Sequence, residues 1–229
     1  AWTLSPTGPS LCAHHRAAAA ALLRDRELLG AELSTRRVDS LLNSPTTNDG
    51  ATLFVVLVWS EARSCVAAAL FRPAGAMMSS QLILVACTPD ARRHGIGRAI
   101  VRFVRHACCR IGGSSANPAA ATSGDAELNV MVPHSAPKSS AMRKFFRAAG
   151  FAASTRKLGL TEFISPFEAS TPLVGLSCAL SAEAANVASS TDVGALLALA
   201  RLAPRGSKRN VMAEDGDDGG EDEDEDEDE

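Results

Sequence analysis

The feature that most constrains the fold is a junction between a buried strand and an amphipathic helix near the middle of the chain. Residues 81–87 are almost all apolar, which is typical of a strand covered on both faces. A turn with glycines at positions 95 and 97 follows, and apolar residues then recur at helical spacing over 96–107. This junction predicts a sheet with at least one helix packed on its face.

The start of this helix is also a predicted anion-binding site. The first N–H groups of a helix have no acceptor inside it, and the helix dipole attracts negative charge there. The two glycines remove Cβ atoms that would keep a ligand away, so successive N–H groups can converge on a pyrophosphate. Three arginines add positive charge: Arg92, Arg93 and Arg98. No G-x-x-x-x-G-K-[ST] string is present, and Ile100 stands where a dinucleotide fingerprint needs its third glycine.

The remaining patterns predict a mixed α/β fold. Helices are expected over 11–33 and 34–42, and after residue 139, where Ser139 or Ser140 is the cap and Gly150 the stop. Strands are expected over 53–58, 65–71, 81–87 and 127–132, with a closing hairpin over 151–156 and 158–164. This order predicts a mixed sheet with helices packed on it.

At this junction the sequence resembles the GNAT acetyltransferases. Residues 92–97 read R-x-x-G-x-G, similar to the acetyl-CoA signature of that family, and residues 82–89 resemble its fourth strand. Residues 141–151 resemble its second hallmark, a helix that ends in Gly-Phe. The resemblance spans residues 11–164 and implies a mixed, mostly antiparallel central sheet flanked by helices. It also implies an N-acetyltransferase that moves an acetyl group from acetyl-CoA to a primary amine, with a protein lysine or N-terminus as candidate acceptors.

The resemblance assigns ten residues to acetyl-CoA. In the family, pantetheine pairs with the backbone of the fourth strand where that strand splays from the fifth. This implies that Val85, Ala86 and Cys87 lie beside the pantetheine. The pyrophosphate loop then comprises Arg92, Arg93, His94, Gly95, Ile96, Gly97 and Arg98.

Two departures from the family concern catalysis. Many members use a tyrosine as general acid where this chain has Phe146, and the chain contains no tyrosine. The histone-acetylating branch has a glutamate eleven residues before its R-x-x-G-x-G, and that position is Gln81 here. Because an amide accepts no proton near neutral pH, the candidates for a relocated base are Glu127, His134 and Glu61. The departures leave open a degenerate module that binds acyl-CoA or a protein without turnover.

Charge divides the chain into unlike parts. Residues 214–229 hold half of the 26 acidic residues and none of the 23 basic ones, so the preceding part has a net charge of +10. We expect a GNAT-like domain over 1–164, an extension over 165–213 with one helix at 193–202, and a disordered acidic tail over 214–229. The tail is a solubilising segment, a site for a basic partner such as a histone, or a screen over the basic domain. Direct binding of nucleic acid ranks last, because no array of aromatic residues for base stacking is present.

Several other classes are not favoured. The six cysteines form no C-x-x-C pair, which argues against a zinc ribbon and favours a reducing compartment, the cytosol or the nucleus. His14 and His15 have no nearby partners for a metal, so no metal site is expected. No apolar run approaches the roughly 18 residues of a membrane span.

Overall fold

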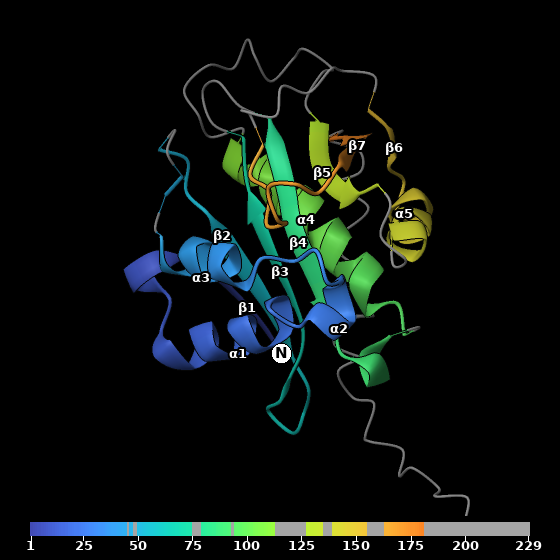
Figure 1. The fold of residues 1–229 in the computed structure, drawn as a ribbon. Helices are drawn as coiled ribbons and strands as arrows, with labels where there is room; N and C mark the ends of the chain where they lie inside the picture. The colour runs from blue at the N-terminus through green and yellow to red at the C-terminus, as the bar shows by residue number, and fades with distance from the viewer. Residues whose placement is uncertain are drawn as a thin grey trace, which may run out of the picture.

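The computed structural model of the chain describes residues 1–44, 46–47, 50–74, 79–92, 94–112, 127–134, 139–154 and 163–180 (Figure 1). Its helices are α1 (Ala13–Leu23), α2 (Arg26–Leu29), α3 (Thr35–Asn43), α4 (Ile96–Gly112) and α5 (Ser139–Ala148). Its strands are β1 (Trp2–Pro6), β2 (Phe54–Trp59), β3 (Cys65–Arg72), β4 (Ser80–Cys87), β5 (Glu127–Pro133), β6 (Ala152–Ala153) and β7 (Leu173–Ala179). The predicted helix at 193–202, the acidic tail and Arg93 lie outside the described residues. None of the described helices is long and apolar enough to cross a membrane.

The strands form one sheet in the order β1-β2-β3-β4-β5-β7-β6. Every neighbouring pair is antiparallel except β4 and β5, which are parallel. The predicted fold class, a mixed and mostly antiparallel sheet flanked by helices, is therefore confirmed. Strand β1 was not predicted, and its presence makes β4 the fourth strand, as the resemblance implied.

The sheet separates two hydrophobic cores. Because side chains alternate along a strand, Val55 and Leu57 of β2 join the core under α1–α3, whereas Val56 and Val58 join the core under α4. Figure 1 shows α1, α2 and α3 grouped on one side of the strands, and α5 beside β5 and β6. Burial on both faces explains why these strands read as continuous apolar runs.

The helix predicted over 11–33 is two helices. Asp25 interrupts it, because its carboxylate accepts hydrogen bonds from the N–H groups of Glu27 at 2.8 Å and Leu28 at 3.0 Å and so caps α2. Gly30, at φ +112°, follows α2. This break places Leu28 and Leu29 on a short helix of their own, and both matter for the site.

Helix α5 ends as predicted at Gly150. That glycine has φ +92°, its N–H donates to Arg147 O at 3.0 Å, and the Phe151 N–H donates to Phe146 O at 3.0 Å. This pair of bonds is a Schellman motif, which needs a left-handed residue that glycine supplies at no steric cost.

The second strand of the predicted closing hairpin, 158–164, lies mostly outside the described residues. Phe163 and Ile164, which the structure describes, belong to no strand. The partner of β5 is β7, paired with it from Glu127↔Ala179 to Pro133↔Leu173. The sheet thus continues past residue 164, where we expected the domain to end. Gly175 and Ser177 interrupt the apolar pattern of β7, which explains why it was missed.

Candidate functional site

The site begins where the parallel strands β4 and β5 part. They pair at only three positions, from Ser80↔Leu128 to Leu82↔Val130. The next residue of β4, Ile83, is a β-bulge, because Leu82 and Leu84 face consecutive residues of β3. Such a bulge bends its strand. Beyond it β4 remains paired with β3 and β5 with β7, so a gap opens between β4 and β5.

The edge of β4 that faces this gap offers backbone hydrogen bonds. The Thr88 N–H donates to Val66 O of β3 at 2.9 Å. Because main-chain groups alternate between the two edges of a strand, those of Val85 and Cys87 point the other way, toward the gap. An extended ligand with amide groups can pair with such an edge as an added strand does.

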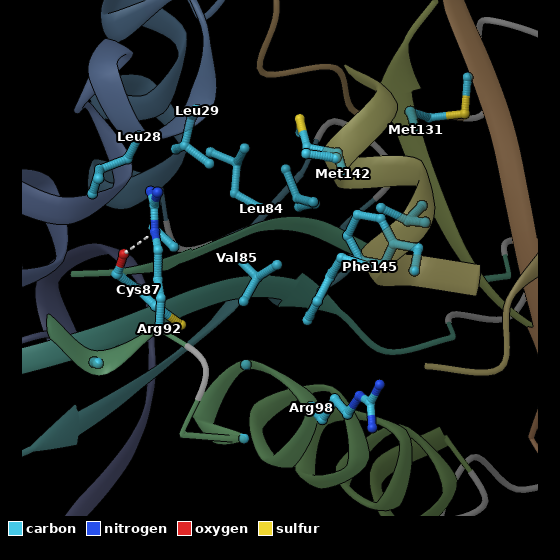
Figure 2. Close-up of a pocket in the computed structure, with 18 of the residues that line it drawn as sticks. Leu28, Leu29, Leu84, Val85, Cys87, Arg92, Arg98, Met131, Met142 and Phe145 are labelled. Atoms are coloured by element: carbon cyan, nitrogen blue, oxygen red, sulfur yellow. Dashed lines mark hydrogen bonds between the residues drawn. The ribbon is translucent and has the colours of Figure 1, made fainter. Parts of the chain in front are cut away.

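A cavity of about 650 Å³ follows the gap (Figure 2). This volume lies in the range of roughly 300–1,000 Å³ that is typical of small-molecule sites. Figure 2 shows Leu84 and Val85 of β4 along its length, Met142 and Phe145 of α5 on one side, and Arg98 of α4 below. The cavity therefore joins the gap to the beginning of α4.

The beginning of α4 presents unpaired N–H groups. The Ala99 N–H donates to Gly95 O at 3.0 Å, which makes Gly95 the N-cap. The N–H groups of Ile96, Gly97 and Arg98 consequently have no acceptor within the helix. Gly95 adopts φ +79°, a conformation that other residues rarely take.

Gly97 also leaves space for side-chain packing beside the cavity. A Cβ atom on Gly97 would lie 3.1 Å from the Phe145 ring and 3.6 Å from the Cys87 sulfur. This glycine therefore leaves room for side chains of α5 and β4, so that α4 and α5 approach closely beside the cavity.

The positive charge at the cavity comes from two arginines. The lining residues with charged side chains are Arg92 and Arg98, both exposed, among those that the structure describes. The Arg92 Nε donates to Cys87 O at 3.4 Å, and its guanidinium extends toward Leu28 in Figure 2. An anion at the start of α4 would meet these two cations together with the helix dipole.

Cys87 lines the cavity as a neutral thiol. Burial raises its pKa to about 11, although the nearby Arg92 opposes the shift. Nucleophilic reactivity requires the thiolate, so Cys87 behaves near neutral pH as a small apolar residue.

Most residues predicted to contact acetyl-CoA come together at this cavity. Seven of the ten line it: Val85, Ala86, Cys87, Arg92, Gly95, Gly97 and Arg98. Ile96 is buried in the core below, His94 is exposed and does not line the cavity, and Arg93 lies outside the described residues. Their contacts with a ligand stay predictions.

The candidate bases lie elsewhere. Glu127 begins β5, at the end of that strand opposite to the gap, and Glu61 is exposed in the β2–β3 turn. His134 is exposed just after β5, and its N–H donates to Pro172 O at 2.8 Å. None of the three lines the cavity, and their catalytic roles stay predictions.

Gln81 is fully buried and has a structural role. Its Nε2 donates to Ile164 O at 2.7 Å, and its Oε1 accepts from the Ile164 N–H at 3.0 Å. Both functional groups of the amide are thus bound to the backbone of a single residue. Gln81 holds that segment, residues 163–168, which we call the strap, against β4.

The strap also binds to the loop between α2 and α3 and to α3 itself. The Ser34 N–H donates to Pro166 O at 2.9 Å, and the Arg37 Nη1 donates to Phe167 O at 2.6 Å. Phe167 pairs with Leu33 as an isolated bridge, is 1% exposed and lines the cavity. No sequence motif signalled that the strap would form a wall of the site.

Phe146, at the position of the family's tyrosine, is a packed core residue. It is 3% exposed, and its ring is tilted by 68° and 67° to those of Phe145 and Phe151, with centroid distances of 5.1 Å and 5.4 Å. It lines the cavity with an apolar surface.

Comparison with solved structures places this architecture in a known class. No protein-family model and no curated protein sequence matches the chain. A GNAT-family acetyltransferase from Staphylococcus aureus matches with a TM-score of 0.55 and 11% identity, over 79% of this chain and 100% of that one. Tetrahymena GCN5 matches with a TM-score of 0.53 and 8% identity, over 78% and 96% of the two chains. The chain therefore has the GNAT fold.

Proposed function

We propose that the protein is an N-acetyltransferase that uses acetyl-CoA to acetylate a primary amine, with a protein lysine or N-terminus as acceptor. One observation carries the proposal: the gap between β4 and β5 opens directly onto the start of α4. A single cavity thus combines a strand edge for an amide-containing arm with a cationic helix terminus for phosphates. These are the two chemical parts of CoA.

The described residues divide the binding task along the cavity. The N–H groups of Ile96, Gly97 and Arg98, with the guanidinium of Arg92, would hold the pyrophosphate. The main-chain groups of Val85 and Cys87 would pair with the two amides of pantetheine. When bound, the thioester would supply an activated acetyl group, and the β4 edge would orient it toward the part of the cavity that Leu29 and Met142 line.

Calorimetry with CoA and acetyl-CoA is the first test. We expect binding of both, and we expect Gly95→Val to weaken both, because a β-branched residue is strained at φ +79°. Gly50→Val is a matched control, because Gly50 has a similar φ of +77° and does not line the cavity. No binding of either ligand at high micromolar concentration contradicts the proposal.

A thiol-release assay tests turnover and the acceptor. Peptides with one internal lysine and a blocked N-terminus are compared with lysine-free peptides that have a free N-terminus. If CoA is released with only one of the two sets of peptides, that set identifies the acceptor class. Histone-like peptides belong in the panel, because the acidic tail would attract a basic protein.

A binding module without turnover is the second candidate. Two observations favour it: Gln81 is engaged with Ile164, and Phe146 is packed in the core without a proton to donate. Saturable binding of acetyl-CoA with no thiol release above the buffer rate, over the whole acceptor panel, would support this candidate over the first.

We also propose that the protein acts in a reducing compartment, the cytosol or the nucleus. All six cysteines are free thiols, which suits an environment where thiols persist. Fractionation of cells that express a tagged chain tests this. Recovery in the secreted fraction contradicts it.

A further inference from the structure

The cavity has two ends of opposite character. Its cationic end lies at Arg98 and the start of α4, whereas the Arg92 guanidinium extends along the cavity toward Leu28 (Figure 2). The other end, which we call the apolar chamber, is lined by Leu29, Ile83, Leu84, Met131, Met142 and Phe167. Figure 2 shows Leu29, Leu84, Met142 and Met131 above the strand edge, away from Arg98.

The bulge in β4 creates this chamber. Because Ile83 is the extra residue, Ile83 and Leu84 both join the core on the α1–α3 side instead of alternating. Met142 of α5 packs against both cores and so reaches across the gap. The chamber is thus a continuation of the gap on the side where α2 and the strap lie.

The wall opposite the strands is fixed in place. Leu29 is 5% exposed and Phe167 is 1% exposed. The strap that carries Phe167 is bound by Arg37 and Ser34 at one point and by Gln81 at another. A chamber with such walls requires little rearrangement on binding, which favours affinity.

We propose that the apolar chamber receives the aliphatic part of an acyl group, so that the donors of this site include acyl-CoA thioesters longer than acetyl-CoA. The inference rests on the proposed function, because the CoA moiety must occupy the gap and the start of α4. The apolar chamber suits an acyl chain better than an ammonium group, because none of its six side chains is charged. Each methylene that these side chains remove from water strengthens binding about fourfold.

The transfer reaction is balanced as for acetyl. The neutral amine nitrogen attacks the thioester carbonyl carbon, the C–N bond forms, and the C–S bond breaks with its electron pair on sulfur. The proton that the amine loses passes to solvent, and the CoA thiolate takes up a proton from solvent. The products are an amide and free CoA. A longer chain changes only the group R on the carbonyl.

Calorimetry with the full chain tests the inference without knowledge of the acceptor. The titrants are CoA, acetyl-CoA, butyryl-CoA and hexanoyl-CoA at one ionic strength. We expect the dissociation constant to fall from acetyl to butyryl to hexanoyl, by about fourfold for each methylene that enters the chamber. Equal or weaker binding of the longer thioesters overturns the inference but leaves the proposed function standing. Failure of all four titrants overturns the proposed function itself.

A variant links the effect to the chamber. Met142→Trp fills it from a half-buried position on α5, and we expect the ratio of hexanoyl-CoA affinity to CoA affinity to fall at least tenfold. Met142→Leu conserves volume and should retain the ratio. Thermal melts check that both variants fold, and the chain-length series on the unmodified protein decides the matter if one does not. A ratio unchanged in folded Met142→Trp overturns the assignment of the chamber.

Discussion

Replacement of Gln81 tests whether this residue holds the strap or marks a lost catalytic base. Gln81→Leu removes two hydrogen bonds to Ile164, at 2.7 Å and 3.0 Å, in a fully buried position. Each such bond contributes on the order of 1 kcal/mol net, and the backbone groups left without partners add to the loss. We expect the free energy of unfolding to fall by about 2–3 kcal/mol. For a chain of this size the Tm should fall by about 5–10 °C.

Gln81→Glu gives a sharper result because its effect depends on pH. When protonated, the introduced carboxyl can donate to Ile164 O and accept from the Ile164 N–H, as the amide does. When ionised, it is a buried anion against a carbonyl oxygen, so burial and that oxygen both raise its pKa in the folded state. A raised pKa contributes stability that is complete below the unfolded value of about 4.3 and is lost as pH rises.

The assay is urea unfolding of the parent protein, Gln81→Leu and Gln81→Glu between pH 4.5 and 8, which gives the free energy of unfolding of each. As the pH rises toward the folded-state pKa, the free energy of unfolding of Gln81→Glu should fall further below that of the parent, by up to about 1.4 kcal/mol per pH unit. This decline should end once the pH has passed the folded-state pKa. Gln81→Leu is the matched control, and its deficit relative to the parent should stay constant with pH. A Gln81→Glu variant that is as stable as the parent at pH 8, or that accelerates thiol release, would refute the structural role of Gln81.

Three further predictions concern the cavity and its charge. Gly97→Val should lower the free energy of unfolding by about 1–3 kcal/mol, because the new side chain overpacks against Phe145. Phe145→Leu in the same chain should recover part of this loss. If the effects of the two substitutions on the free energy of unfolding are additive, the two residues are not in contact. Cys87 should react with iodoacetamide far more slowly than exposed Cys12 at pH 8 and faster as the pH approaches 11, because burial has raised its pKa; peptide mass spectrometry measures both rates, and rapid labelling at pH 8 would contradict it. Deletion of residues 214–229 should tighten CoA binding at low salt only, since the lost carboxylates no longer compete for the basic domain; a gain that persists in 1 M salt would exclude this cause.

The sequence predicts most of the fold because four strands are covered on both faces. β2, β3, β4 and β5 are continuous apolar runs, and α4 has a regular apolar stripe, so periodicity alone locates them. β1 escaped prediction because it is a half-exposed edge strand of five residues that ends in proline. β7 escaped because its glycine and serine positions weaken the apolar pattern.

The cationic end of the site was predictable and the apolar chamber was not. Glycines and arginines at fixed spacing before a helix carry a local signal, because the ligand contacts consecutive residues. Leu29, Met142 and Phe167 come from three distant segments, and each is a common core residue in its own surroundings. Only their assembly around the bulge at Ile83 shows that they face a cavity.

The parting of β4 and β5 has a consequence for local opening of the sheet. A sheet whose central strands share only three paired positions has a seam there, and amide protons along it should exchange with deuterium sooner than those of β2 and β3. A thioester arm seated in the seam would act as a missing strand between the two halves. Occupancy should therefore slow exchange at Val85 and Cys87, and couple the halves into one cooperative unit on unfolding.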